Sequence, residues 1–154
     1  MEKEVQRTLD RVFRDGPPKE GLDLQASEMA LRATMLQVGG RLLEKLMNAD
    51  KGGYRGPQIE CGQGHPADFV AYRRKDLVTV LSPVKVKRAY YHCAVCGQGR
   101  IPKDEELDIV DSSFSPGVRR MMGRVGGKEP FDEGRQYLEE LAGVVVKTKA
   151  VERV

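Results

Sequence analysis

The sequence has no long apolar run. No apolar run approaches the about 18 residues of a membrane-spanning helix, and the opening MEKEVQRTLD alternates charges where a signal peptide has an apolar stretch. Three cysteines cannot all pair with one another, and a reduced compartment suits them. The sequence therefore predicts a cytoplasmic protein with no membrane partner.

The chain also has few residues that suit catalysis. Its two histidines both lie beside cysteines, and we find no glycine-rich phosphate loop and no Ser-His-Asp arrangement. Carboxylates gather between residues 104 and 111, where a solvated acidic linker explains them. We therefore expect no catalytic residue and no small-molecule substrate.

Positive charge is concentrated in one segment. A length of 154 residues, with 40% hydrophobic and 32% charged side chains, suits one soluble globular domain or two small modules. The net charge is only +3, yet residues 51–100 carry nine basic and three acidic side chains. Such a segment favours a polyanionic partner, because Lys and Arg near phosphates release condensed counterions. A merely solvated basic face is the alternative.

The N-terminal segment, residues 1–50, reads as helical. A first helix is predicted over residues 5–15, where two prolines follow, and a second over residues 24–48. The second is apolar on two neighbouring faces and must be covered on both. Either other helices of the chain cover it, or it forms a homodimer interface. Gly39-Gly40 in its interior marks a close helix crossing or a kink.

A glycine-rich loop over residues 51–57 separates this segment from a predicted sheet. Residues 69–73, 77–81 and 84–91 are rich in β-branched and aromatic side chains, with turn signals between them. We predict a three-stranded antiparallel meander inside a module over residues 57–103.

Two pairs of metal-binding side chains flank this meander. Cys61 and His65 precede the first strand, and Cys93 and Cys96 follow the last. Zn²⁺ takes four tetrahedral N or S ligands, so the two corners together predict a zinc ribbon, and a full Cys3His set makes the zinc structural. His92 competes for the fourth position, although adjacent strand residues point to opposite faces and His92 should face away from the site.

The C-terminal segment, residues 113–154, reads as helical again. Ser115-Pro116 supplies a cap and a first-turn proline for one helix, and another fits residues 131–142. Three valines form a predicted tight turn before a last helix over residues 147–154. This arrangement is like a helix-turn-helix, although a plain helical hairpin gives the same pattern. The basic side chains expected to face outward are Lys147, Lys149 and Arg153.

Two runs of the chain resemble the N-terminal region of the ISKra family of bacterial insertion-sequence transposases and its uncharacterised relatives. They are VTVLSPVKVKRAYYHCAVCGQGRIPKDEELDI and FSPGVRRMMGRVGGKEPFDEGRQYLEELAGVVVKTKAVERV. The similar order is a knuckle, a T-L-x-G-P-V-x-V-x-R-x-Y-Y-x-C-x-x-C core, a P-x-D-x-x-L step, a Ser-Pro helix and an aromatic-led helix. The resemblance runs from about Cys61 to the C-terminus, with Ser82 where the pattern has Gly. It implies DNA recognition, with catalysis in a ribonuclease-H-like domain that would follow Val154.

These observations predict an α+β fold of N-terminal helices, a central three-stranded zinc ribbon and C-terminal helix-turn-helix-like helices. We expect the chain to be the zinc-stabilised DNA-binding N-terminal portion of a transposase-like protein, without its catalytic domain, acting on double-stranded DNA. The alternative is a zinc-ribbon module for protein interaction, such as an antitoxin-like regulator or an assembly adaptor. The expected phosphate contacts of the ribbon are Arg73, Arg74, Lys75, Lys85, Lys87 and Arg88, and the expected groove contacts are Lys147, Lys149 and Arg153.

Overall fold

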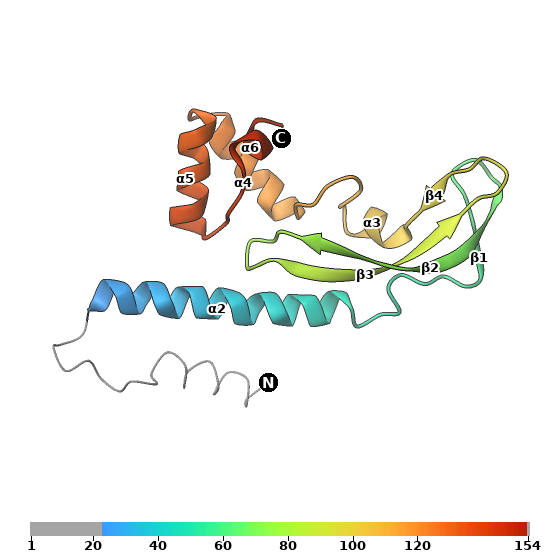
Figure 1. The fold of residues 1–154 in the computed structure, drawn as a ribbon, viewed down its shortest axis with the longest axis horizontal. Helices are drawn as coiled ribbons and strands as arrows, with labels where there is room; N and C mark the ends of the chain where they lie inside the picture. Colours follow the sequence, from blue (N-terminus) through green and yellow to red (C-terminus); the bar gives the residue numbers. More distant parts are fainter. Residues whose placement is uncertain (1–22, 154) are drawn as a thin grey trace.

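The computed structural model describes residues 23–153, which form a mixed α+β fold (Figure 1), so the predicted α+β class is confirmed. The helices are α2 (Leu24–Met47), α3 (Pro102–Glu106), α4 (Pro116–Gly126), α5 (Phe131–Ala142) and α6 (Thr148–Glu152). The strands are β1 (Gln58–Glu60), β2 (Pro66–Leu77), β3 (Val84–His92) and β4 (Gly99–Arg100). The helix predicted over residues 5–15 lies outside the described residues. None of the helices in residues 23–153 combines the length and apolar character needed to cross a membrane.

The sheet is antiparallel and has the order β1-β2-β3-β4, so it contains four strands where three were predicted. The charged triplet at residues 74–76, predicted as a turn, continues β2 instead. Its charges have partners there, because Asp76 lies opposite Lys85 in the register and Lys75 is within 3.6 Å of Asp104. Opposite charges across a strand pair stabilise a sheet. A strand this polar is therefore held by its neighbours rather than by its own propensity.

Residues 78–83, which include most of a predicted strand, form the connection between β2 and β3. The Thr79 hydroxyl fixes this connection, because it donates to the carbonyl of Ser82 (2.7 Å) and accepts from the backbone N–H of Leu81 (3.2 Å). A hydroxyl that bonds to nearby backbone competes with strand pairing. Val78 and Val80 of this connection pack against the core of the C-terminal helices.

The C-terminal end of α2 completes the outer edge of β3. β4 pairs with the end of β3. Further along the same edge, the Asn48 side chain makes the hydrogen bonds to the backbone of β3. Its Nδ2 donates to the carbonyl of Lys85 (2.8 Å), and its Oδ1 accepts from the N–H of Lys87 (2.8 Å). The Glu44 carboxylate accepts from the N–H of Lys85 (2.9 Å). An amide side chain carries both a donor and an acceptor, so Asn48 pairs with β3 as a strand residue would.

Gly40 is the buried residue of α2 and lies against the β2–β3 connection. A Cβ atom on Gly40 would lie 1.8 Å from the Ser82 hydroxyl, and the helix continues through this position without interruption. The two central glycines therefore mark a close approach rather than a kink, and the partner is the β2–β3 connection rather than another helix. The side of α2 opposite Gly40 is exposed and apolar, as Met35 (64% exposed) and Leu46 (74% exposed) illustrate.

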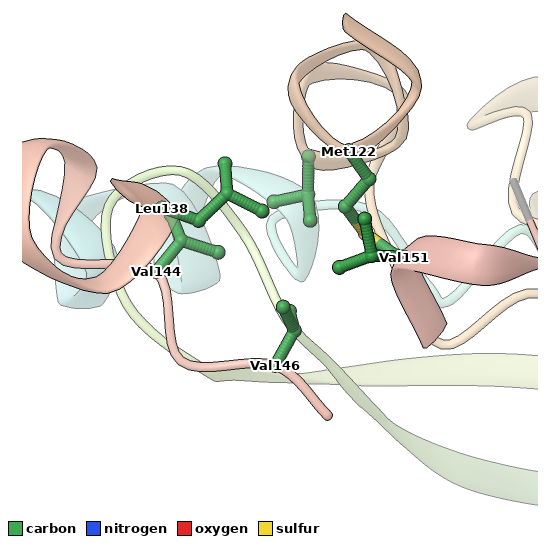
Figure 2. Close-up of a cluster of buried hydrophobic side chains, with 6 residues drawn as sticks. Met122, Leu138, Val144, Val146 and Val151 are labelled. Atoms are coloured by element: carbon green, nitrogen blue, oxygen red, sulfur yellow. The ribbon is translucent and has the colours of Figure 1, made fainter. Parts of the chain in front are cut away.

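Buried apolar side chains fall into three clusters along the molecule. The C-terminal cluster, shown in Figure 2, contains Val118, Met122, Leu138, Val144, Val146 and Val151. The middle cluster contains Leu77, Val84, Val86 and Ile109. The cluster at the end of the sheet where β1 pairs with β2 and β4 pairs with β3 contains Cys61, Ala67, Ala89, Tyr91 and Cys93. Two of the five buried side chains in this last cluster are thiols.

The chain between α5 and α6 differs from the predicted tight turn. Gly143 ends α5 in the left-handed conformation, and the three following valines lie in no helix, strand or turn. Val144 and Val146 are buried and Val145 is exposed, which is the alternation of an extended segment. Burial of two valines in the C-terminal cluster favours this conformation over a turn. The last helix, α6, is consequently only five residues long.

Candidate metal centre and basic surfaces

Both predicted ligand corners are turns, and each joins a long strand, β2 or β3, to a short strand, β1 or β4, that the sequence did not reveal. The N–H of Cys61 donates to the carbonyl of His65 (2.7 Å), which closes the turn between β1 and β2. The N–H of Cys93 donates to the carbonyl of Gln98 (2.9 Å), which closes the turn between β3 and β4. Gly97 has a φ of 70°, a conformation that favours glycine. Since β2 begins where β3 ends, the two turns lie at the same end of the sheet.

The four predicted ligands come together at this end. The ligand atoms of Cys61, His65, Cys93 and Cys96 all lie within 4.8 Å of one another, close enough to hold a metal ion. The sulfurs of Cys61 and Cys96 are 3.8 Å apart. Two sulfurs each about 2.3 Å from a tetrahedral zinc ion are themselves about 3.8 Å apart. Three thiols and one imidazole at this spacing fit a structural zinc ion.

The two histidines are distinguished by position rather than by burial. The Nδ1 atoms of both His65 and His92 are buried, and neither has a hydrogen-bond partner within residues 23–153. His65 belongs to the four-residue cluster and His92 does not. His92 lies on β3 opposite Asp68 of β2. The geometry therefore favours His65 as the nitrogen ligand.

The thiols of the cluster influence one another's ionisation. A backbone N–H of Cys96 directed at the Cys93 sulfur lowers the pKa of Cys93, although burial acts against this. For Cys96, the backbone N–H of Gln98 lowers the pKa, but the neighbouring Cys93 and Cys61 thiols and burial outweigh it, so the pKa is raised. Several thiolates in one place repel one another. A divalent cation that binds thiolates removes this repulsion.

The basic residues predicted to contact phosphates are divided between the two faces of the β2–β3 hairpin. Arg74 lies opposite Lys87, and Lys85 lies two residues from Lys87, so these three share one face. All three are exposed, and the Lys87 ammonium lies 3.9 Å from the ring centroid of Tyr72. We call this set, Arg74, Lys85 and Lys87, the basic sheet face. Its phosphate-binding role stays a prediction.

The opposite face carries the other three, and the structure corrects two of them. Arg88 is only 8% exposed and its guanidinium lies 2.6 Å from the carboxylate of Asp104. Lys75 is partly buried beside the same carboxylate. These two cations stabilise the fold and do not belong to a phosphate-binding surface. Arg73 remains exposed, with its guanidinium 3.4 Å from the ring centroid of Tyr90.

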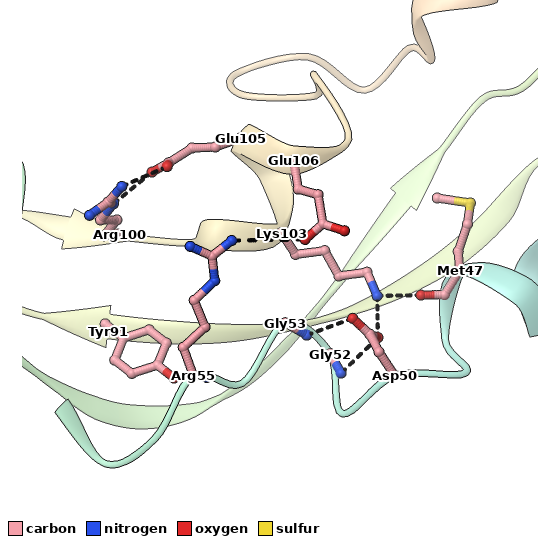
Figure 3. A network of polar contacts seen from close by, with 10 residues as sticks. All are labelled: Met47, Asp50, Gly52, Gly53, Arg55, Tyr91, Arg100, Lys103, Glu105 and Glu106. Carbon is pink, nitrogen blue, oxygen red and sulfur yellow. Dashed lines mark hydrogen bonds and ion pairs between the residues drawn. The ribbon is translucent and has the colours of Figure 1, made fainter. Parts of the chain in front are cut away.

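Part of the acidic segment predicted as a solvated linker forms the short helix α3. Side chains of this helix hold neighbouring parts of the fold together (Figure 3). Glu105 makes two 2.8 Å hydrogen bonds to Arg100 of β4, and this pairing lowers the pKa of Glu105. The buried ammonium of Lys103 donates to the carbonyl of Met47 and to the carboxylate of Asp50. α3 thus joins the loop after α2 to β4. Proline at its first position was the one local signal that could have revealed this helix.

The three predicted groove contacts, Lys147, Lys149 and Arg153, are all exposed. Lys149 lies within α6, and the other two flank it. Their role in binding stays a prediction.

Comparisons with known proteins identify no relative. No protein-family model matches the chain, and neither the curated proteins nor the solved structures contain a match. The resemblance to transposases therefore stays a hypothesis carried by the sequence pattern.

Proposed function

We propose that this chain is a zinc-stabilised, non-catalytic DNA-binding module of a transposase-like protein. The Cys3His cluster at one end of the basic β2–β3 hairpin is the observation that supports it most. Four protein ligands fill the coordination shell of zinc, so the ion holds the two turns together and leaves no open position for chemistry. Binding then falls to the side chains of the sheet and helices.

The basic sheet face suits the phosphate backbone of a duplex. Arg74, Lys85 and Lys87 are exposed, and no ion pair within residues 23–153 neutralises them, although Asp76 lies opposite Lys85. Such contacts position a protein on DNA without reading its sequence. Sequence preference must then come from another part of the chain.

Salt dependence of DNA binding tests this proposal. Each phosphate contact contributes about 0.9 to the slope of log K against log salt concentration, so loss of two contacts lowers the slope by about 2. We expect Arg74→Gln/Lys87→Gln to show this reduction in fluorescence anisotropy with a labelled duplex. Arg135→Gln is the control, because Arg135 already pairs with Asp132 and Glu139 on α5. Failure of the zinc-loaded parent to bind duplex DNA would refute the proposal.

A protein-interaction module is the second candidate, and the exposed side of α2 favours it. The exposed residues there are Leu24, Leu31, Met35, Leu42 and Leu46. Their spacing of seven and four residues is typical of a coiled-coil seam, which pairs with a copy of itself. In this proposal the occupant is α2 of a second copy of the chain, and the module is a homodimer.

Light scattering separates the two candidates. If α2 forms the interface, the parent is a dimer, and Met35→Glu converts it to a monomer because a charge then lies in the apolar seam. Gln37→Glu is the matched control, since Gln37 lies on the other side of α2 beside the β2–β3 connection. A dimer without DNA affinity supports the interaction module, whereas a monomeric parent contradicts it.

A further inference from the structure

The solvent-facing side of α4 carries basic residues that the sequence patterns did not single out. Met122 is fully buried beneath α4. At 100° per residue, Arg120 and Arg124 lie on the opposite side of the helix, and both are exposed. They are four residues apart, so their side chains are neighbours along one face. Lys128 is exposed in the turn directly after the helix.

Several other arginines within residues 23–153 have side-chain partners that stabilise the fold. Arg32 donates to the last carbonyls of α5, Arg88 is held by Asp104, and Arg119 of α4 itself is held by Asp108. Within residues 23–153, the side chains of Arg120, Arg124 and Lys128 make no hydrogen bond or ion pair. Three unengaged cations on one face have no evident structural role.

We propose that α4 is a second contact with duplex nucleic acid, with Arg120, Arg124 and Lys128 binding its phosphates. This inference rests on the proposed DNA-binding function and adds a site to it. The residues between the cations on this face are glycines, Gly123 and Gly127, both exposed. With no side chains there, the helix can approach a phosphate backbone closely.

The composition of this face favours nucleic acid over other polyanions. A helix that lies on a membrane needs bulky apolar side chains beside its cations, and this face offers glycines instead. The neighbouring helices are poorer candidates for a duplex. α5 exposes Asp132, Glu133 and Glu140, and α6 is only five residues long. α4 is the longer basic surface of this helical part.

Two double variants with the same change in charge test the proposal. Arg120→Gln/Arg124→Gln removes two cations from α4, and Lys147→Gln/Lys149→Gln removes two from the start of α6. We expect the α4 variant to lower the salt slope of duplex binding by about 2 and the affinity by about tenfold or more. We expect the α6 variant to retain more affinity than the α4 variant. Both should keep the parent's melting temperature, since all four residues are exposed.

The outcomes separate this inference from the proposed function. If the parent binds no duplex, both fail. If the parent binds and the α4 variant keeps its affinity and slope, only the assignment to α4 fails. Arg120→Lys/Arg124→Lys should restore binding, because phosphate contact requires the charge. If the α4 variant lost binding to anionic phospholipid vesicles but bound duplex as the parent does, the ligand of α4 would be a membrane surface rather than nucleic acid, and the inference would be overturned.

Discussion

Asp104 is a buried carboxylate that holds two cations. Its side chain is 9% exposed and lies 2.6 Å from Arg88 and 3.6 Å from Lys75. Asp104→Asn leaves the shape of the side chain nearly unchanged but removes the negative charge that pairs with Arg88 and Lys75. Breaking a buried pair in this way costs about 3–5 kcal/mol, because an unpaired charge stays in the interior. We expect that loss of unfolding free energy in urea denaturation of the zinc-loaded protein.

The neighbouring residue provides the control for Asp104. Glu105 pairs with Arg100 in two hydrogen bonds, but its side chain is 44% exposed. We expect Glu105→Gln to cost about 1 kcal/mol or less, because exposed pairs contribute little. Equal losses for the two variants would mean that Asp104 is not the central anion of this part of the fold.

His65 and His92 provide a matched pair for the metal site. We expect His65→Ala to reduce bound zinc and to destabilise the end of the sheet, because only His65 belongs to the four-ligand cluster. His92→Ala should retain one zinc per chain. Elemental analysis after gel filtration measures both. The opposite result, with zinc lost only from the His92 variant, would exchange the roles of the two histidines.

Among single residues, the metal-ligand types could be predicted from short spacings in the sequence, whereas ion pairs between distant residues could not. The ligands Cys61, His65, Cys93 and Cys96 stand out because metal-binding residue types recur at short spacing. Arg88 gave no such signal, since its partner Asp104 lies 16 residues away and across the fold. An arginine in a strand looks the same in the sequence whether it faces solvent or a buried carboxylate.

At the scale of elements, the edge of β3 depends on one amide. Asn48→Ala removes both hydrogen bonds to the backbone of Lys85 and Lys87. Leaving such groups without partners costs about 1–3 kcal/mol. We expect faster hydrogen exchange at the Lys87 amide, whereas the Lys85 amide keeps its bond to Glu44. Glu44→Gln is the control and should change little, because its amide oxygen still accepts.

The strands that were mispredicted show why periodicity alone was insufficient. β2 continues through residues 74–76 because β3 pairs with it. Residues 78–83 leave the sheet because Val78 and Val80 pack against the C-terminal cluster. β1 and β4 are three and two residues long and carry no pattern of their own. By contrast, α2, α4 and α5 have the spacing and end signals that a sequence reveals, and their bounds lie close to the predicted ones.

At the scale of the whole molecule, stability is distributed over separate cores. The apolar C-terminal cluster is built from Val, Leu and Met side chains, whereas the cluster at the metal end includes two thiols and two alanines. The middle cluster lies between them on the β2–β3 hairpin. Apart from Tyr91, the buried side chains of this cluster are small and bury little apolar surface, so a bound metal would add stabilisation where aliphatic packing is thin.

Removal of the metal should therefore loosen one end of the molecule before the other. After chelation, we expect hydrogen exchange to accelerate over residues 58–68 and 91–100, because an ion bound by the Cys3His cluster would join the two turns that these segments contain. The amides of α4 and α5 should keep their exchange rates, since their core lies beyond the other end of the hairpin (Figure 1). Exchange mass spectrometry of both forms measures this difference. Equal loss of protection in both regions would instead show that the chain unfolds as one cooperative unit, with the metal stabilising all of it.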